Sequence, residues 1–165
     1  MRLCGQQAVW NYEEENGLLT IQGVGAMEDY TEPEQVPWNS LMQEIKVVVI
    51  RDGITTVGDY AFAGCSNLQE VTLPGSVEIV GVFSFKGCTG LREIVIPEGV
   101  RVLASKAFQF CSALKKVYLP STLIDVDMRA FGKCESLEEV FYQGSEEQWE
   151  QIMISRAAYD NQYLV

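Results

Sequence analysis

A solenoid of stacked β coils is the fold class that the sequence predicts, because one short pattern returns along most of the chain. The stretch AFAGCSNLQEVTLP, from Ala61 to Pro74, recurs three times at a step of 23 residues. Four columns keep that step: Cys65, Cys88, Cys111 and Cys134; Leu68, Leu91, Leu114 and Leu137; Phe62, Phe85, Phe108 and Phe131; and Pro74, Pro97 and Pro120. Internal periods of about 20 to 50 residues are typical of solenoids, in which each repeat buries its apolar face against its neighbours.

Within each unit, the apolar spacing predicts the parts of one coil. Leu68, Val71 and Leu73 follow the L-x-x-V-x-L pattern of a strand in a leucine-rich coil. A second short apolar set follows an intervening turn, at Ile54/Val57, Val77/Val80, Val100/Leu103 and Leu123/Val126. Phe62 and Cys65 are three residues apart, as one 3₁₀ or helical turn would place them. About seven side chains of each coil therefore point inward, and each large one contributes about 1.5–3 kcal/mol when buried.

The cysteine column is interpreted as core packing. Equivalent residues of a parallel, in-register ladder lie about 4.8 Å apart, which exceeds the Cβ separation of about 3.8 Å found in disulfides. We therefore expect a column of buried free thiols. The alternative, a metal–thiolate stack, lacks the Cys-x-x-Cys pair or histidine that would give zinc a converging ligand set. Cys4 stands outside the column and is expected either to be exposed or to pack in the N-terminal cap.

Segments that depart from the repeat lie at both ends and are predicted to cover the apolar faces that a solenoid exposes there. Residues 1–46 are the predicted N-terminal cap, with a strand and glycine turn at 17–27 and a short amphipathic helix at 37–45. One face of that helix carries Trp38, Leu41, Met42 and Ile45. Residues 47–139 are predicted to be four 23-residue repeats, and residues 140–165 the last strand and the C-terminal cap, all in one structural domain.

The C-terminal cap is predicted to contain a helix within residues 144–155. Ser145 is its expected N-cap, and the two glutamates that follow favour the positive end of the helix. Trp149 and Ile152 are expected to plug the end of the solenoid. With both ends covered, we expect a complete short solenoid rather than a slice of a longer one.

Composition excludes several classes of function. The net charge of −11 argues against a nonspecific nucleic-acid binder and against an anionic membrane surface, because both need a surplus of Lys and Arg. The absence of histidine removes Ser-His-Asp and Cys-His nucleophilic sites and the commonest metal ligand. No apolar run approaches the roughly 18 residues of a membrane span, and the N terminus lacks the hydrophobic segment of a secretory signal. Either the protein stays inside the cell, or its leader is missing from this sequence.

The unit ITTVGDYAFAGCSNLQEVTLP, from Ile54 to Pro74, resembles the treponemal-type, BspA-like leucine-rich repeats of bacterial surface proteins. The segment from Leu19 to Trp38 is similar to the cap found with such repeats in gut Firmicutes, and the segment from Val140 to Ile152 to their closing segment. The resemblance implies a leucine-rich-repeat solenoid, a right-handed α/β or mostly-β coil with a parallel in-register sheet, short strands, 3₁₀ or helical turns, an N-terminal β/α cap and a C-terminal helical cap. It also implies a secreted or cell-surface protein of a host-associated bacterium with an adhesion or interaction role, and it carries no catalytic, cofactor-binding or metal-binding residues to transfer.

Strand residues between the buried ones are predicted to face outward in two columns. These columns are Val47, Glu70, Glu93, Lys116 and Glu139, and Val49, Thr72, Val95, Tyr118 and Phe141. An apolar and aromatic column on an exposed sheet favours binding, because aromatic side chains bring large contact area at low entropy cost. The candidate interaction residues, here called the binding strip, are Val95, Tyr118, Phe141, Glu93 and Lys116. Alternatively, these side chains stabilise the sheet by cross-strand pairing, whatever they bind.

Acidic and glycine-rich stretches elsewhere in the chain resemble other kinds of site. Asp125 and Asp127 lie on one face of a strand and are interpreted either as a shared cation site or as an acidic edge that discourages strand pairing. The acidic run Glu13–Glu15 is expected to be a solvated loop before the hairpin-turn dipeptide Asn16-Gly17. The stretch GVGAM lacks the βαβ context of a nucleotide site.

Three functional hypotheses follow from these observations. The first is a non-catalytic protein-interaction or adhesion module that binds an unknown host or bacterial protein or glycan through its sheet face. The second is a structural spacer or self-associating scaffold, since an exposed apolar strip also suits a homodimer face. The third is a carboxylate-based enzyme, which is disfavoured because a filled solenoid offers no pocket. We expect no cofactor, no nucleic-acid partner and no insertion into a membrane.

Overall fold

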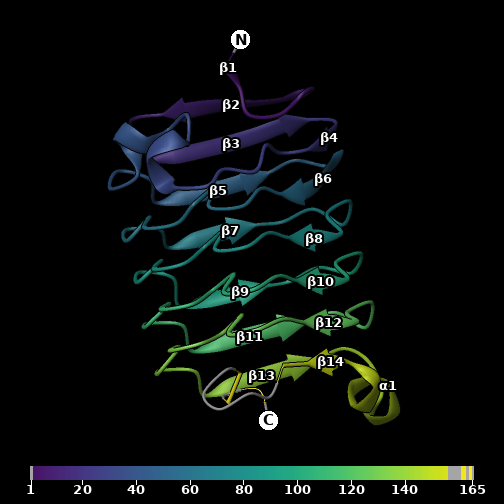
Figure 1. The fold of residues 1–165 in the computed structure, drawn as a ribbon. Coiled ribbons are helices and arrows are strands. Elements are labelled where there is room, and N and C mark those ends of the chain that lie inside the picture. Colours follow the sequence, from purple (N-terminus) through teal and green to yellow (C-terminus); the bar gives the residue numbers. More distant parts are fainter. Residues whose placement is uncertain (1, 156–160, 163, 165) are drawn as a thin grey trace.

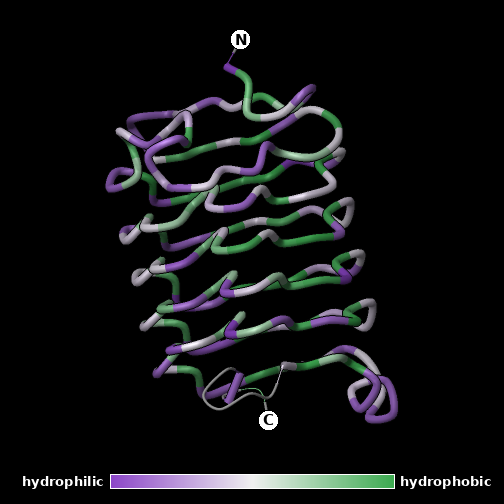
Figure 2. Tube along the Cα trace, in the orientation of Figure 1, coloured by the Kyte–Doolittle hydropathy of each residue, from purple (hydrophilic) through white to green (hydrophobic). Residues whose placement is uncertain are grey.

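The computed structural model describes residues 2–155, 161, 162 and 164, which form a stack of coils along one axis (Figure 1). A repeated coil contributes one strand to the front side of the stack, one strand to a second sheet, and a tight turn that closes it. Hydrophobic residues follow the strands, and hydrophilic residues gather at the corners (Figure 2). The leucine-rich-repeat solenoid predicted from the sequence is confirmed.

The front side carries strands at the positions of the L-x-x-V-x-L pattern. These strands are β5 (Val47–Ile50), β7 (Glu70–Thr72), β9 (Glu93–Val95), β11 (Lys116–Leu119) and β13 (Glu139–Tyr142). They are parallel and in register at the 23-residue step, so that Lys116 pairs with Glu93 on one side and Glu139 on the other. Among the described residues, β7 belongs to a sheet of order β1-β2-β3-β5-β7, whereas β9, β11 and β13 form a sheet of their own. The expected parallel sheet is therefore present in two parts.

The second sheet is built from the other apolar set of each coil. Its strands are β4 (Gly25–Ala26), β6 (Ile54–Val57), β8 (Ile79–Val80), β10 (Val102–Leu103), β12 (Asp125–Val126) and β14 (Met153–Ile154). They run in parallel in the order β14-β12-β10-β8-β6-β4. The expected burial of this set is confirmed, since its members, Ile54 through Val126, are at most 2% exposed. The sheet itself was not predicted, because strands of two residues are too short to show an alternating pattern.

The third side, here called the turn side, closes each coil at residues 58–67, 81–90, 104–113 and 127–136. The amide of Cys65 donates to the carbonyl of Phe62 at 3.2 Å, which confirms the expected tight turn. Successive turns are joined by backbone hydrogen bonds, such as the one from the Phe62 amide to the Ser84 carbonyl at 2.7 Å. The turn side is therefore a hydrogen-bonded wall, although it contains no assigned strand within the described residues.

A ladder of aromatic rings runs through the core along the turn side. Neighbouring members are stacked with ring centroids 5.1–5.5 Å apart: Trp38 on Phe62, Phe62 on Phe85, Phe85 on Phe108 and Phe108 on Phe131. All five side chains are fully buried. Trp38 thus extends the phenylalanine column into the segment predicted as the N-terminal cap, which is a continuity that the 23-residue pattern did not reveal.

The N-terminal segment begins with a meander of three antiparallel strands. It comprises β1 (Arg2–Leu3), β2 (Ala8–Glu13) and β3 (Leu18–Gly23), and β3 then pairs in parallel with β5. Exposed residues 14–16 and Gly17, whose φ is 61°, form the expected hairpin turn. Glu13, expected in this loop, is instead the last residue of β2 and pairs with Leu18. Two 3₁₀ helices follow, η1 (Pro33–Gln35) and η2 (Asn39–Leu41).

The helix predicted at residues 37–45 is wrong in extent, since the structure has the single 3₁₀ turn η2 and hydrogen-bonded turns after it. Its burial pattern is nevertheless as expected, with Trp38, Met42 and Ile45 buried and Leu41 partly buried. Asparagine and serine at the start of η2 are weak helix formers. The chain must also enter β5 by Val47, because the amide of Lys46 already donates to the carbonyl of Gly17 at 2.8 Å.

At the other end, α1 (Glu146–Gln151) begins at Ser145 as predicted. The Ser145 hydroxyl accepts from the Gln148 amide, and the Gln148 side chain accepts from the Ser145 amide, which completes a capping box. The helix lies to the side of the stack, at the corner between β13 and β14 (Figure 1). Trp149 there packs against the Tyr142 ring at 5.2 Å, and Ile152 is buried. The boundaries of the two predicted caps stay predictions.

Side chains end the backbone ladder of the turn side. At the N-terminal end, the indole nitrogen of Trp38 donates to the carbonyl of Ala61 at 2.8 Å. At the C-terminal end, the Phe131 amide donates to Oδ1 of Asn161 at 3.0 Å, in place of the carbonyl that a further coil would supply. Asn161 is 1% exposed, and its Nδ2 donates to the carbonyl of Asp127 at 2.9 Å. Buried amides and carbonyls at both ends thereby keep a partner.

Two positions in each turn adopt the left-handed conformation. The first position is occupied by Tyr60, Phe83, Lys106 and Arg129, and the second by Gly64, Gly87, Phe110 and Lys133. The non-glycine members have φ between 55° and 61°, a conformation that costs an L-residue about 1–2 kcal/mol. The second position thus changes from glycine to larger residues in the third and fourth coils. There the backbone keeps the left-handed conformation, which strains Phe110 and Lys133 but not a glycine.

We expect the substitution Lys133→Gly to stabilise the protein. Lys133 is exposed and has a φ of 61°, so glycine relieves strain of about 1–2 kcal/mol and loses about 0.5–1 kcal/mol in chain entropy. Urea unfolding is predicted to show a gain of up to about 1 kcal/mol. The matched control Lys133→Ala removes the same side chain without relieving the strain, and an equal gain in that control would contradict this explanation.

We also expect Ser84→Ala to be stabilising. Ser84 is fully buried in a column whose other members are Ala61, Ala107 and Ala130, and its hydroxyl has no hydrogen-bond partner in the described part of the chain. Removing an unpaired buried hydroxyl is worth about 1–3 kcal/mol, which thermal unfolding detects as a higher Tm. The converse variant Ala107→Ser should lower the Tm, and an unchanged Tm in both variants would be inconsistent with an unpaired hydroxyl.

Candidate interaction site

The binding strip lies entirely on the sheet formed by β9, β11 and β13. Register places Val95, Tyr118 and Phe141 side by side across these strands. The rings of Tyr118 and Phe141 are stacked, with centroids 4.8 Å apart and planes 14° from parallel. Val95 is 48% exposed and Phe141 is 42% exposed, whereas Tyr118 between them is partly buried. The structure therefore brings together the apolar residues singled out from the sequence and leaves them facing solvent.

A charged row runs beside these apolar residues. Lys116 lies between Glu93 and Glu139 in register, and its Nζ is 3.0 Å from a carboxylate oxygen of Glu139. The hydrogen bond and the negative charge of Glu139 raise the pKa of Lys116. Both partners are more than 40% exposed, so the pair adds little stability and holds two charges at fixed positions on the surface.

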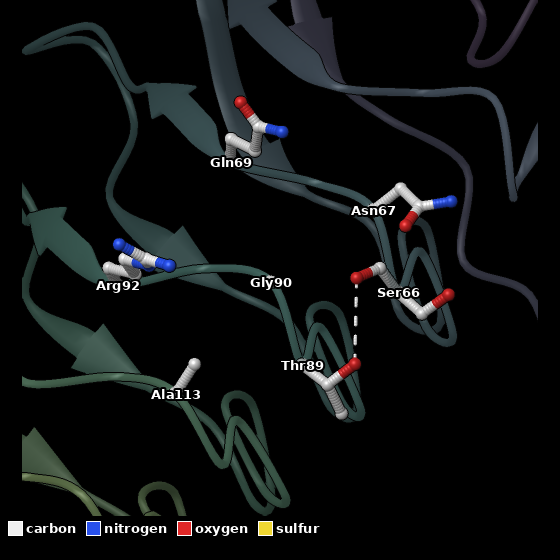
Figure 3. A pocket seen from close by; sticks show the side chains of 7 residues that line it. All are labelled: Ser66, Asn67, Gln69, Thr89, Gly90, Arg92 and Ala113. Carbon is white, nitrogen blue, oxygen red and sulfur yellow. Dashed lines mark hydrogen bonds between the residues drawn. The ribbon is translucent and has the colours of Figure 1, made fainter.

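A polar depression of about 460 Å³ lies at the division between β7 and β9. Figure 3 shows the residues that line it, which come from three successive coils: Ser66, Asn67, Gln69, Thr89, Gly90, Arg92 and Ala113. Gln69 and Arg92 directly precede β7 and β9, so the depression borders the strip at the start of these strands. Gly90 belongs to its lining, and a Cβ there would lie 2.8 Å from the Ser66 carbonyl oxygen.

Hydrogen bonds fix one end of the depression. Asn67 Nδ2 donates to the Gln43 carbonyl at 2.7 Å, and the Ser66 hydroxyl donates to Oε1 of Gln43. Thr89 Oγ1 donates to the Ser66 carbonyl at 3.5 Å, the contact drawn in Figure 3. Gln69 and Arg92 are exposed and present amide and guanidinium groups at the opposite end. The arrangement offers hydrogen-bond donors and acceptors to a polar group.

The repeat pattern is matched by one family model over most of the chain. The model describes the BspA type leucine rich repeat region, and six copies of it match residues 40–159. The chain belongs to this family. A comparison with curated proteins finds no match.

Solved structures with the same fold include other leucine-rich repeat proteins. A leucine rich cell surface protein from Faecalibacterium prausnitzii A2-165 is 22% identical, with a TM-score of 0.74 over 93% of this chain and 42% of its own. A leucine-rich repeat protein from Eubacterium ventriosum is 23% identical, with a TM-score of 0.67 over 88% of this chain and 44% of its own. The T. pallidum leucine rich repeat protein is 17% identical, with a TM-score of 0.54 over 87% and 84%. This BspA-type chain thus spans less than half of the first two structures.

The cysteines of the BspA-type repeats are part of the core. All five, including Cys4, are free thiols with buried side chains, as expected for the column. The thiols of Cys88, Cys111 and Cys134 each donate to a phenylalanine carbonyl of the preceding coil at 3.2–3.3 Å. Burial raises the pKa of Cys65 to about 12, so this thiol is protonated and unreactive near neutrality. Within the described residues, no cluster of three or more His, Cys, Asp or Glu is arranged to hold a metal.

The interpretations of Asp125 and Asp127 need correction. β12 lies between β10 and β14, so Asp125 is on an interior strand and the proposed acidic edge is wrong. Burial and the charge of Asp127 raise the pKa of Asp125, and Oδ1 of Asp127 accepts from the Met128 amide at 2.6 Å. A Ca²⁺ ion needs about 6–8 oxygen ligands, and no third acidic group joins this pair in the described part of the chain.

Sequence reasoning missed the polar depression. Its signal is present in the column between the repeated cysteine and leucine, where Asn67 is followed by Gly90 and Ala113. Two small residues in successive coils leave a hollow on the surface. Predicting that hollow from the sequence requires knowing that this column faces outward. As to membranes, no helix in the described residues is both long enough and apolar enough to cross a bilayer.

The buried thiols predict a loss of stability in alkali. Cys65 has a pKa of about 12 in the folded chain and about 9 when exposed, so above pH 9 unfolding releases a proton and the unfolded state is favoured. Each such thiol lowers the free energy of unfolding by about 1.4 kcal/mol per pH unit in this window. Urea unfolding between pH 8 and about 10.5 measures the slope. The variant Cys65→Ala should show a slope smaller by one proton, and an unchanged slope would refute the assignment.

Proposed function

We propose that this chain is a non-catalytic protein-interaction module of a secreted or cell-surface bacterial protein, which binds a protein partner through the front side. The observation that carries the proposal is the stacked pair Tyr118 and Phe141 beside exposed Val95, on one three-residue row of a rigid sheet. Solvent-exposed apolar side chains in a contiguous row are a feature of interaction surfaces.

The geometry suits binding because the row is already ordered. Tyr118 and Phe141 hold each other by stacking, and the strands below them are fixed by the buried residues Val117 and Leu119. Little side-chain entropy remains to be lost when a partner covers such residues. Aromatic side chains that are rigid before binding are typical of residues that contribute most to affinity.

The surroundings of the row resemble the rim of an interface. The Lys116–Glu139 ion pair lies beside the aromatic stack, and the polar depression with Gln69 and Arg92 borders the start of the strands. Protein interfaces commonly combine an apolar centre with a polar, partly hydrated rim. An extended apolar row favours a protein partner over a glycan, because the hydrogen-bonding groups lie at its margin.

The family supports the cellular context of this proposal. Its members are repeat proteins, and one protein of the same fold is described as a cell surface protein. A non-enzymatic role agrees with the repeat fold and with the absence of histidine from the sequence. Adhesion is the specific activity that we infer for such a module at a bacterial surface.

A peptide library displayed on phage tests the binding strip. Peptides selected on the immobilised chain are expected to carry aromatic or aliphatic anchors and to lose at least about 30-fold in affinity for the double variant Tyr118→Asp/Phe141→Asp. The matched control is Ile79→Asp/Met153→Asp, which places the same charges at exposed apolar positions of the second sheet. Circular dichroism confirms that both variants fold. Equal binding to wild type and to the strip variant would rule out this face.

A further inference from the structure

The turn side carries opposite charges on its two halves. The N-terminal half is the segment over the first turn, residues 28–36, whose exposed acidic residues are Glu28, Asp29, Glu32 and Glu34. This segment contains no Lys or Arg. The basic half lies on the later turns. The second and third turns carry Lys86 and Lys106 and no acidic residue, and the fourth carries Arg129 and Lys133 beside the exposed Asp127 and Glu135. In a chain with a net charge of −11, one third of the 12 Lys and Arg residues therefore lie on these turns.

Hydrogen bonds hold the acidic segment against the first turn. The Asp59 amide donates to Oδ1 of Asp29 at 3.0 Å, and the Tyr30 amide donates to the Asp59 carbonyl at 3.2 Å. Gln43, further along, donates to the Gly64 carbonyl at 3.0 Å. The segment projects on the same side of the stack as the turns below it (Figure 1). Its charges are thus displaced along the solenoid axis from those of the basic half.

The basic half is ordered by contacts with aromatic rings. Nζ of Lys86, from the same turn, and Nζ of Lys106, from the next turn, each lie 4.9 Å from the centroid of the Phe83 ring. Lys86 also lies 6.0 Å from the Phe110 ring. Cation–π contacts of this kind fix the ammonium groups and leave their charge available to a partner. Lys86 and Lys106 form no ion pair within the described residues.

Tyr60 of the first turn lies between the acidic segment and the basic turns, and two further aromatic residues, Phe83 and Phe110, lie within the basic half. The rings of Tyr60 and Phe83 are in contact, with centroids 4.7 Å apart, and both side chains are partly exposed. Phe110, one coil further, is 46% exposed. An apolar centre flanked by charges of opposite sign is the layout of a self-complementary surface, because rotation by 180° about its middle exchanges the two halves.

We propose that the turn side binds the turn side of a second copy of this chain, antiparallel and related by a two-fold axis near Tyr60 and Phe83. In this arrangement the acidic segment of each copy faces the basic turns of the other, so the charge complementarity is satisfied twice. The contact is isologous and therefore closes as a dimer rather than growing into a filament. It leaves the binding strip free, and so goes beyond the proposed function without depending on it.

Screening allows the local pattern to outweigh the net charge. At physiological ionic strength the Debye length is about 8 Å, so charges that face each other across an interface interact while the distant acidic residues are largely screened. The complementary halves then set the orientation of the copies. Conversely, in about 1 M salt the Debye length falls to about 3 Å, and the dimer should weaken.

Charge reversal tests the orientation directly. The acidic variant is Lys86→Glu/Lys106→Glu, and the basic variant is Glu32→Lys/Glu34→Lys. Each variant alone brings like charges together and should be a monomer by light scattering and sedimentation under conditions in which wild type dimerises. An equimolar mixture of the two should form a heterodimer, with affinity restored at least about tenfold over either variant alone. Thermal unfolding verifies that each variant is folded.

Two further variants separate this surface from the others. Arg92→Glu/Lys115→Glu makes the same charge change outside the turn-side patch and should leave the dimer intact. Tyr118→Asp/Phe141→Asp, which is designed to disable the binding strip, should also leave it intact. Wild type that stays monomeric at low salt overturns the proposal, as does a mixture of charge-reversed variants that fails to associate. A dimer that dissolves only with the strip variant also overturns it and assigns self-association to the front side.

Discussion

The stacking of equivalent side chains at one fixed step is the constraint on which this structure depends. The rings of Phe62, Phe85, Phe108 and Phe131 can remain about 5 Å apart only if each coil returns the backbone to the same place after 23 residues. The same 23-residue return of the backbone fixes the spacing of every other column of equivalent residues. Cysteine thiols then reach the phenylalanine carbonyl of the preceding coil, and short strands of two to four residues find partners in register. A strand of two residues is stable here because its neighbours above and below are placed by the same core.

The same constraint separates residues that must recur from residues that are free to differ. Inward columns are nearly invariant along the chain, whereas outward columns change charge and size from one coil to the next, as between Glu93 and Lys116. The two surfaces proposed for binding are both outward columns of this kind. On the front side, change between coils has produced an apolar row, and on the turn side it has separated acidic from basic residues along the axis. A regular scaffold thus carries irregular surfaces without altering its core.

Periodicity explains which parts were predictable from the sequence. The front-side strands, the burial of the cysteine and phenylalanine columns and the outward direction of Val95, Tyr118 and Phe141 follow from the repeated 23-residue step. The ends do not repeat, so nothing in the spacing indicated that Trp38 would join the ring ladder or that Asn161 would receive the last amide. The predicted helix at 37–45 followed a helical burial pattern, but connection to β5 limits it to one 3₁₀ turn. β12 is an interior strand of the second sheet because β14 pairs with it. β14 follows the helix α1 and does not keep the 23-residue step, so the spacing did not predict it.

The side chains that end the backbone hydrogen-bond ladder of the turn side have a consequence for how such chains vary in length. Trp38 and Asn161 bind the ladder through side chains, and the turns between them repeat the same backbone hydrogen bonds, from the Phe62 amide to Ser84 and from the Phe85 amide to Ala107. Duplication of one 23-residue unit in the middle of the chain therefore shifts the C-terminal part by one coil and leaves both terminating contacts unchanged. Such a duplication would also move the acidic segment one coil further from Lys106 and Lys133, so chains of different repeat number would match copies of their own length best. The number of repeats would then determine which copies pair with one another.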